Sequence, residues 1–448
     1  MNSMKIHWPK IVIPEGFDDA ESYLRHLVYE GAKDRFADVE EPYLSEIFEK
    51  IEDELCYLKG YEPYFIIVHG IANFCKSERI LFRIAYGYAD SSIVNYCLGI
   101  TDVNPNYISV YIERFFLKGD SLYPDINLEV DNTRKEDVVK YLKTTYGEDY
   151  VLNAGVGYLP TYDEKERQRV PVYSEHFSAI CIFDKPYSEV TDVVEIKYED
   201  SGETAIVPKL TYAELESLGY IYIDIIGMKS LNYIDRTLQM IEKNKGKRIE
   251  YEKIPLYDPA TYEYLTSGNE EVSKIWYKKA IYDIFSYVKP QNIYDLTCVF
   301  VMAHHRMWDE LISLKTLIEE DDFDTAFWVF DDFFQHESHG FLIYQEQILL
   351  ILHIMSNLDM TECERIRRQM QYPDQEPVKS IFLNSVKEHG FYDVKEAERI
   401  WIYFMKHHKK TSSLAHFYNI TVDYYRRTWL RVHYPEEFKA CYILSETK

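Results

Sequence analysis

Hydrophobic and polar residues follow a helical period in the first part of the chain. Between 17 and 60, apolar side chains recur three and four residues apart, as at Leu24 and Val28. This spacing places them on one face of a helix, so we expect helices here, one of them over 43–58. The same period predicts a helix over 134–146.

A period of two replaces the helical one in the segment YPDINLEV, residues 123–130. Successive side chains of a strand point to opposite faces, so the alternation predicts a strand with two unlike faces. One face carries the apolar side chains of Ile126, Leu128 and Val130. The other face carries a row of oxygen-bearing side chains, those of Asp125, Asn127 and Glu129.

The middle of the chain combines strands with irregular segments. Short apolar runs predict strands over 178–183 and 192–197, whereas 150–175 shows neither period and is expected to be irregular. In TYAELESLGYIYIDIIGM, residues 211–228, a helix leads through a tight connection into a buried strand. That strand carries Asp224 between apolar neighbours.

From about residue 229 the helical period dominates, interrupted by the acidic and aromatic run at 319–334. The predicted fold class is therefore α/β followed by mainly α. A chain of 448 residues, 46% of them hydrophobic, buries a large core, which excludes wholesale disorder. The net charge of −25 opposes unguided association with nucleic acid, so any such site must be a local basic stripe.

Cysteine usage and apolar runs bear on localisation. The seven cysteines are scattered without paired spacing, which argues against a zinc ribbon or a disulfide framework. The longest apolar run, at 64–74, is about half a membrane span, and the N-terminus lacks a signal-peptide pattern. We therefore expect a cytoplasmic protein that has no membrane partner.

The acidic strand and the isolated Asp224 form a pattern with a chemical meaning. Nucleotidyl transferases hold two divalent cations between acids on neighbouring strands, because Mg²⁺ prefers several anionic oxygen ligands. Asp125, Asn127, Glu129 and Asp224 would supply such a set. An alternating polar row is also typical of a solvated strand face, so the spacing alone leaves both interpretations open.

Eight segments, in order, carry a resemblance to a known family. They are LGITDVNPNYISVYIERFF (98–116), YPDINLEV (123–130), KEDVVKYLKTTYGEDYV (135–151), LTYAELESLGYIYIDIIGMKSLNYID (210–235), IPLYDPATYEYLTSGN (254–269), HGFLIYQEQILLI (339–351), ERIRRQM (364–370) and HYPEEFKACYILSE (433–446). They resemble the alpha subunit of bacterial DNA polymerase III, the C-family replicative polymerase. The likeness runs along nearly the whole chain.

This resemblance implies a nucleotidyl-transferase palm over 1–228, a mixed sheet with helices, and a helical fingers-like domain over 229–448. Strands at 124–130 and 221–226 should then lie side by side. The resemblance also implies a shortened chain, which begins after the family's phosphoesterase-like domain and ends before its clamp-binding region. Only a reduced thumb insertion, near 152–174, would remain.

The resemblance further implies a site for Mg²⁺ or Mn²⁺ held by Asp125, Asn127 and Asp224. The family strand reads P-D-x-D, whereas this chain reads PDIN, so the neutral amide of Asn127 replaces one carboxylate. The implied catalytic residues are Asp125, Asp224 and Glu129. Glu129 lies about 6.6 Å beyond Asn127 along the strand and would reach a metal only if the strand shifted.

Groups that bind phosphate in the family are largely replaced. Its glycine–serine loop aligns with IAYGYADSS at 84–92, where tyrosines fill the approach, and in its H-A-G-G segment Ser178 and Ala179 follow His176 in place of glycines. The candidates for nucleotide or phosphate binding that remain are Arg306, Arg367, Arg368 and His416. For the three arginines, the alternative to phosphate binding is an ion pair with a neighbouring acid, and we favour this alternative.

Two further runs allow two interpretations each. The YQEQ run at 344–347 is intact and serves either packing or binding. The most basic region is the candidate nucleic-acid-binding surface, with a solvated face as the alternative. It comprises Lys406, Lys409, Lys410, Arg426 and Arg427.

The joint loss of phosphate-binding groups and a metal ligand favours a catalytically impaired pseudo-polymerase. It would bind DNA, or a protein partner that supplies missing polymerase parts, in a replication-related, mobile-element or defence setting. The alternative is an active metal-dependent nucleotidyl transferase of altered specificity, which uses Asp125, Glu129 and Asp224 with a nucleoside triphosphate.

Overall fold

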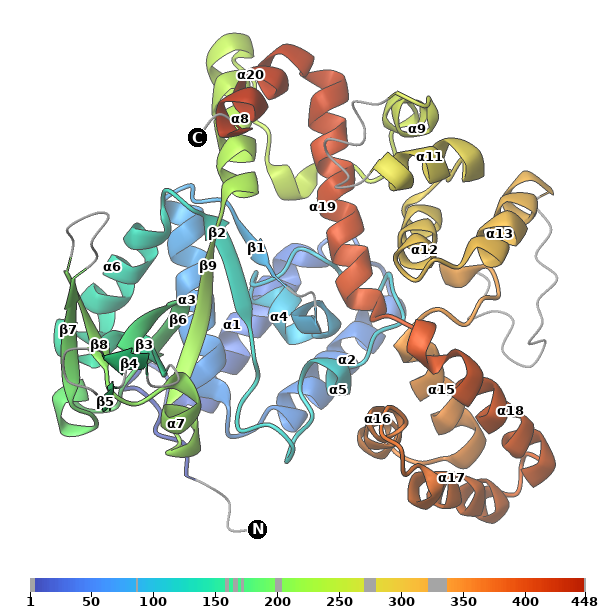
Figure 1. Ribbon diagram of the computed structural model, residues 1–448, viewed down its shortest axis with the longest axis horizontal. Coiled ribbons are helices and arrows are strands. Elements are labelled where there is room, and N and C mark those ends of the chain that lie inside the picture. The colour runs from blue at the N-terminus through green and yellow to red at the C-terminus, as the bar shows by residue number, and fades with distance from the viewer. Residues whose placement is uncertain are drawn as a thin grey trace. The chain divides into compact units, whose positions relative to one another are not determined.

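The computed structural model describes residues 5–85, 88–157, 161–163, 168–170, 173–197, 204–269, 279–320 and 337–446. The chain forms two compact units (Figure 1). Unit 1 comprises Met1–Ala89, Ile93–Asp102 and Lys118–Asp235, and unit 2 comprises Asp90–Ser92, Val103–Leu117 and Arg236–Lys448. The units thus divide after Asp235, and two short segments from the first half of the chain belong to unit 2. The expected domain boundary at 228 stays a prediction.

Unit 1 is built around a five-stranded sheet in the order β1-β2-β9-β6-β3 (Figure 1). The strands are β1 (Phe82–Ile84), β2 (Asn127–Asp131), β3 (Val151–Gly157), β6 (Tyr173–Ile182) and β9 (Ile221–Met228). Strands β2 and β9 are parallel and the other neighbours are antiparallel, so the sheet is mixed. The expected adjacency of the two acidic strands is confirmed.

The expectation of irregular structure over 150–175 is wrong. This part of the chain contains β3, the start of β6, and the two-stranded sheet of β4 (Thr161–Asp163) and β5 (Gln168–Val170). The sequence of β3 shows no clear alternation of apolar and polar residues, in part because Gly155 packs against the backbone of residues 208–210. A Cβ atom there would approach the carbonyl oxygens of Pro208 and Leu210 to 2.5 and 2.8 Å.

The remaining elements of unit 1 match the expected helices and strands only in part, since no helix was predicted over 62–77 and no strand over 204–208. The helices are α1 (Ala20–Arg35), α2 (Tyr43–Tyr57), α3 (Glu62–Ser77), α4 (Ile93–Cys97), α6 (Lys135–Tyr146) and α7 (Tyr212–Ser217), and β7 (Val193–Lys197) pairs with β8 (Thr204–Pro208). Helix α1 begins after Asp19, whose side chain accepts a hydrogen bond from the Ser22 amide at 2.8 Å. This cap replaces a bond that the first turn of a helix lacks.

One face of the large sheet is buried where β2 and β9 run side by side. The side chains of Leu128, Val130 and Ile225 are 0% exposed, and helix α6 packs on β3 and β9. On β9 the alternate residues Tyr222, Asp224 and Ile226 are only half-buried. The alternation therefore separates an apolar face from a face that carries the polar residues.

Unit 2 is helical over its described residues. Its helices are α5 (Ile112–Phe115), α9 (Pro259–Thr266), α11 (Lys279–Val288), α12 (Ile293–His304), α13 (Trp308–Glu320), α15 (Gln345–Ser356), α16 (Met360–Gln369), α17 (Glu376–His389), α18 (Val394–His407), α19 (Leu414–His433) and α20 (Pro435–Glu446), together with most of α8 (Lys229–Lys245). The expectation of a mainly helical second half is confirmed. Most of the acidic and aromatic run at 319–334 lies outside the described residues.

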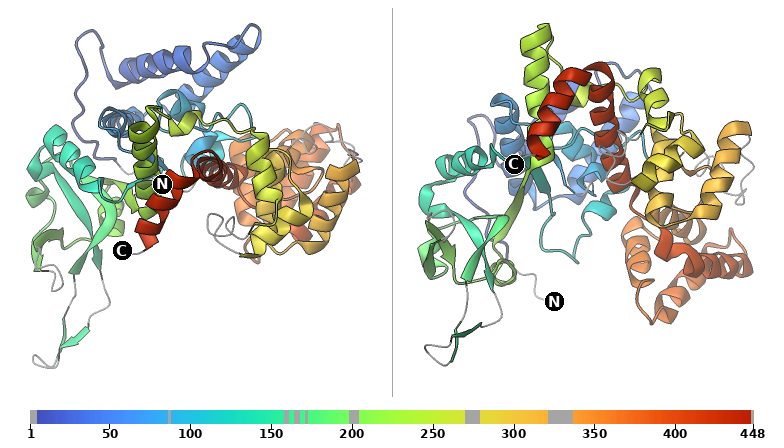
Figure 2. Two further views of the ribbon diagram at one scale, coloured as in Figure 1. Left: turned by 90° about the horizontal axis from the view of Figure 1, so that it is seen from above. Right: turned by 45° about the horizontal axis from the view of Figure 1, so that its top comes forward.

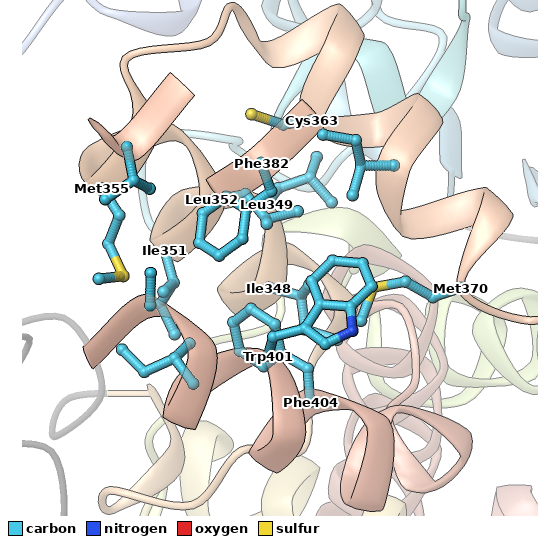
Figure 3. Packing of buried hydrophobic residues seen from close by; sticks show 14 of the residues in the cluster. Ile348, Leu349, Ile351, Leu352, Met355, Cys363, Met370, Phe382, Trp401 and Phe404 are labelled. Atoms are coloured by element: carbon cyan, nitrogen blue, oxygen red, sulfur yellow. The ribbon is translucent and has the colours of Figure 1, made fainter. Parts of the chain in front are cut away.

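Helices α15 to α18, orange to red in Figure 2, share one apolar core. Figure 3 shows Leu349 and Leu352 of α15 meeting Phe382 of α17 and Trp401 and Phe404 of α18. These five residues are at most 3% exposed. Burial of such side chains stabilises a fold by about 1.5–3 kcal/mol each.

A buried ion network joins the segment 103–117 to the rest of unit 2. The Arg114 guanidinium donates from Nη1 to Glu364 Oε1 at 2.8 Å and lies 3.4 Å, at Nε, from Glu346 Oε1. It also donates to the Gln345 side chain. The three charged side chains are at most 3% exposed. Because an unpaired buried charge is costly, these groups must stay together.

The charge of Glu364 depends on this network. Burial by itself raises the pKa of Glu364, but the hydrogen bond from Arg367 and the charges of Arg114 and Arg367 outweigh it and hold the pKa at about 2. Arg368 also donates to this carboxylate, at 2.8 Å. The carboxylate is therefore ionised at neutral pH.

Over the described residues, no helix of this fold is long and apolar enough to cross a membrane.

We predict that Arg114→Met destabilises unit 2 by about 3–5 kcal/mol, because it leaves two carboxylates buried with less compensation. Urea unfolding, followed by circular dichroism, measures the change. Arg365→Met on α16 is the control, because the Arg365 side chain is exposed and its pair with Glu362 lies at the surface. Equal unfolding midpoints for the two variants would contradict the prediction.

A second prediction concerns Glu337, which is buried and accepts a hydrogen bond from the Ser109 amide at 2.5 Å. Burial raises the pKa of Glu337 to about 7. The folded state thus keeps a proton that the unfolded chain releases near pH 4.5, so stability falls as pH rises from about 4.5 to 7. Glu337→Gln should flatten this loss in thermal unfolding at pH 5, 6 and 8. Glu398→Gln, at an exposed residue, should leave the pH dependence as in the parent chain.

Candidate carboxylate site

The parallel pairing of β2 and β9 brings the candidate metal ligands together. Asn127 lies directly opposite Asp224 in the register of the two strands. Asp125 precedes β2 by two residues and therefore faces the same way as Asn127. The register of the two strands thus places Asp125, Asn127 and Asp224 at one edge of the half-open face of the sheet.

Asp224 is already engaged by a side chain from the next strand. Ser178 Oγ on β6 donates to Asp224 Oδ1 at 2.7 Å. His176 Nδ1 accepts from the Ala179 amide at 3.1 Å and lies 3.2 Å from Ser178 Oγ. Since Nδ1 is an acceptor, neutral His176 carries its proton on Nε2. Ser178, which stands where the family has a glycine, therefore satisfies one carboxylate oxygen of Asp224 with a hydrogen bond.

Asp125 belongs to a group of acids that disfavour one another's charge. Desolvation by the surrounding protein raises the pKa of Asp125, a hydrogen bond with Asn127 lowers it, and the charge of Asp224 raises it again. Burial and the charge of Asp125 raise the pKa of Glu216 on α7. The Asn127 amide thus stabilises a neighbouring carboxylate instead of adding a third charge.

Glu129 points into an internal ion pair. It lies opposite Arg83 of β1 in the strand register, and Arg83 Nε donates to Glu129 Oε2 at 2.6 Å. The residue is 9% exposed. Its charge is therefore compensated within the sheet, and a role in metal binding would require this pair to break.

The donor set does not fit two divalent cations. Asp125 and Asp224 supply two carboxylates, Asn127 supplies a neutral amide oxygen, and Arg83 holds Glu129. Across the described ranges, no three His, Cys, Asp or Glu residues gather closely enough to hold a metal ion. Two Mg²⁺ ions need more anionic oxygens than these residues offer.

The segment aligned with the phosphate-binding loop is closed by the chain's own side chains. Ala89, Ser91 and Ser92 are buried, and residues 86–87 lie outside the described ranges. The buried Glu54 carboxylate accepts from the amides of Ile93 and Val94, both at 3.1 Å. These are the first amides of α4, and a phosphate would have to displace Glu54 to reach them.

The candidate phosphate-binding residues of unit 2 lie in different settings. Arg367 and Arg368 form ion pairs with the buried Glu364, each at 2.7–2.8 Å. Arg306 is exposed and follows α12 with a left-handed φ of 56°. His416 is half-buried in the first turn of α19, whose cap is Ser413. The structure therefore gives Arg367 and Arg368 the ion-pair role that was the alternative.

The basic candidate surface divides into two parts. Lys406, Lys409 and Lys410 are exposed. Arg426 and Arg427 are 8% and 5% exposed; Arg427 pairs with Asp423, and Arg426 donates to the Glu252 carbonyl oxygen. Nucleic acid would reach the lysines directly, whereas the two arginines are used inside unit 2.

The YQEQ run serves packing. Gln347 accepts from the amides of Ile343 and Tyr344 at 2.9 and 2.8 Å, and its own amide donates to Ser338 Oγ at 2.7 Å. Glu346 accepts from the Leu414 amide at 2.9 Å. Retention of this motif is thus explained by the fold of unit 2.

Sequence reasoning missed three groups that shape the candidate site. Arg83 and Glu54 lie outside the segments that carry the resemblance, and Glu216 lies within one of them, 210–235, at a position to which no role was assigned. Arg83 acquires its role only because β1 pairs with β2 in a register that places it opposite Glu129. A strand alignment around 82–84 is the signal that would have found it.

Comparisons with known proteins agree with this architecture. A family model of the bacterial DNA polymerase III alpha NTPase domain matches residues 22–171, and one of the alpha-subunit finger domain matches residues 230–390. The DNA polymerase III subunit alpha of Staphylococcus aureus strain MRSA252 is 23% identical over 87% of this chain and 42% of its own length. The Staphylococcus epidermidis protein of the same name is 23% identical over 85% and 41%.

The mixed sheet of unit 1 and the helical unit 2 are thus consistent with the domains of that subunit. This chain is a relative of the bacterial DNA polymerase III alpha subunit. It spans about two fifths of the length of the curated relatives that it matches.

We predict that Asn127→Asp destabilises unit 1 by about 1–2 kcal/mol in the presence of a chelator, because it adds a third charge beside two carboxylates. Millimolar Mg²⁺ should reverse the loss, since the added oxygen completes an anionic donor set. Thermal unfolding with and without Mg²⁺ measures both effects. Asn269→Asp, at an exposed position, makes the same charge change and should respond to neither condition.

Proposed function

We propose that this chain is a DNA polymerase III alpha-like protein whose carboxylate site supports little or no templated DNA synthesis. In this proposal the sheet of unit 1 is a nucleotidyl-transferase palm and unit 2 corresponds to the fingers. The chain acts by binding nucleic acid, or a protein partner that supplies missing polymerase parts, in a replication-related or mobile-element setting.

The observation that carries the proposal is the position of Asn127. Its amide lies opposite Asp224, where the family strand has an aspartate. Two-metal transfer of a nucleotide needs carboxylates that bridge both cations, and a neutral amide attracts them far less. The Ser178 hydroxyl further satisfies Asp224 without a metal.

The groups that would neutralise a triphosphate support the same conclusion. Arg367 and Arg368 are committed to Glu364, and Glu54 holds the amides at the start of α4. Transfer of a nucleotide depends almost entirely on positioning and on neutralising the phosphate charge. With these groups used internally, binding of a triphosphate in a reactive position loses most of its support.

The competing function is an active nucleotidyl transferase of altered specificity that uses Asp125, Glu129 and Asp224. It requires the Arg83–Glu129 pair to open and Glu129 to turn towards the other two acids. Mg²⁺ or Mn²⁺ would be its cofactor, and a nucleoside triphosphate its substrate. The two functions differ in whether the purified chain incorporates nucleotides.

We predict that the purified chain extends a primed template with labelled deoxynucleotides and Mg²⁺ or Mn²⁺ no faster than its Asp125→Ala and Asp224→Ala variants. Bare oligonucleotides are tested in parallel as acceptors. Incorporation that disappears in both variants would establish the transferase and refute the proposal.

A restoring variant makes the absence of activity informative. Asn127→Asp combined with Ser178→Gly returns both positions to the residue types of the family strands. Magnesium-dependent incorporation by this variant alone would identify the two positions as the cause of impairment. An inactive restoring variant that binds Mg²⁺ would place the cause in the phosphate-binding groups instead.

A further inference from the structure

Strand β7 has one edge that no other described strand covers. On its other side it pairs with β8, and β8 lies beside β3, where Gly155 packs against the Pro208 backbone. Within the part of the chain that the structure describes, β8 is the only strand paired with β7, and Figure 1 shows β7 at the margin of unit 1. Such an edge offers a row of backbone N–H and C=O groups to a further strand.

The pairing with β8 decides which residues of β7 offer these groups. The Lys209 amide donates to the Asp192 carbonyl oxygen at 2.9 Å, directly before the first pair of the two strands. In an antiparallel ladder every second residue bonds to the same neighbour. The residues two and four positions beyond Asp192 therefore bond to β8. The residues between and beyond them turn their backbone groups to the open edge, and these are Val193, Glu195 and Lys197.

The same three residues carry exposed side chains. Val193 is 39% exposed, and Glu195 and Lys197 are exposed as well. Ile206 of β8 lies opposite Glu195 and is 47% exposed. Neither Glu195 nor Lys197 forms an ion pair with a described residue. The edge thus presents one acid and one cation, two residues apart, with apolar side chains beside them.

A second copy of this strand fits the edge in one register. Two β7 strands related by a two-fold axis at Ile196 run antiparallel, and Glu195 of each copy then lies opposite Lys197 of the other. Because both residues turn their backbone groups outward, each such pair exchanges two backbone hydrogen bonds and also brings opposite charges together. Axes at Glu195 or at Lys197 would instead place like charges directly opposite, which is destabilising.

The size and charge of this contact make the association weak. Each copy contributes an edge of five residues, whereas a standard interface uses about 20–30 residues a side. The net charge of −25 on each chain also opposes association. At physiological salt, however, the Debye length is about 8 Å, so distant charges are screened while the Glu–Lys pairs remain within reach of each other.

We propose that β7 is a dimerisation edge, to which a second copy of this chain adds its own β7 antiparallel, with Glu195 of each copy opposite Lys197 of the other. The two hairpins then form one four-stranded sheet in the order β8-β7-β7-β8. This inference goes beyond the proposed function. The oligomeric state is measured without any assay of DNA synthesis, so either proposal can fail alone.

The test is sedimentation equilibrium of the whole chain at about 150 mM salt. We expect the average mass to rise from the monomer value towards the dimer value between micromolar and submillimolar concentrations. Glu195→Lys and Lys197→Glu each turn both cross-strand pairs into like charges, so each should weaken dimerisation by about tenfold or more.

Two recombinations of these variants distinguish a defined contact from a general effect of charge. Glu195→Lys/Lys197→Glu exchanges the two charges within one chain and restores both opposite-charge pairs in the proposed register, so it should dimerise like the parent chain. An equimolar mixture of the two single variants also pairs each cation with an acid. This mixture should associate more tightly than either single variant alone.

The matched control is Glu388→Lys on α17, which makes the same charge change at an exposed position and should dimerise like the parent chain. Thermal unfolding establishes that all variants are folded. A parent chain that stays monomeric throughout would overturn the proposal and leave the edge to a strand of another protein. Single variants of β7 that dimerise like Glu388→Lys, or a charge exchange that restores nothing, would also overturn it.

Discussion

The cost of burying a charge determines which charged side chains of this protein remain available to a ligand. Arg114, Glu346 and Glu364 lie inside unit 2 and stay together because each would be destabilising alone. Glu364 then attracts Arg367 and Arg368. Residues that the family resemblance marks as phosphate-binding are thereby used for structure. The same cost of burying polar groups explains the intact YQEQ run, which supplies hydrogen-bond acceptors and donors to this buried network.

In unit 1 the strand register imposes the corresponding constraint on the carboxylates. Asn127 lies opposite Asp224, so an aspartate there would raise the local negative charge in the absence of cations. The amide, the Ser178 hydroxyl and the Arg83 guanidinium together satisfy the three remaining acids from within the chain. Each acid thus has a partner within the chain, although burial and the charge of Asp224 still raise the pKa of Asp125. We regard these internal contacts as the physical meaning of the departures of the site from the family pattern.

Side chains on the solvent-facing surface do not have to satisfy buried charges or a strand register. Packing requires only the inner face of α18, where Trp401 and Phe404 enter the core. The outer face is open to change, and it carries exposed side chains of both charges, among them Lys395, Glu398 and Arg399.

The sequence by itself determined the features that depend on local periodicity. These are the helices of the first 60 residues, the acidic strand at β2, the buried strand that carries Asp224 and the helical second half. The resemblance added that the two strands are neighbours. Tertiary structure alone decided the partners: Arg83 meets Glu129 across 46 residues, and Arg114 meets Glu364 across 250. It also placed Arg426 and Arg427 in the interior and ordered β3 around Gly155. Periodicity is set by neighbours along the chain, whereas partners depend on register and packing between distant segments.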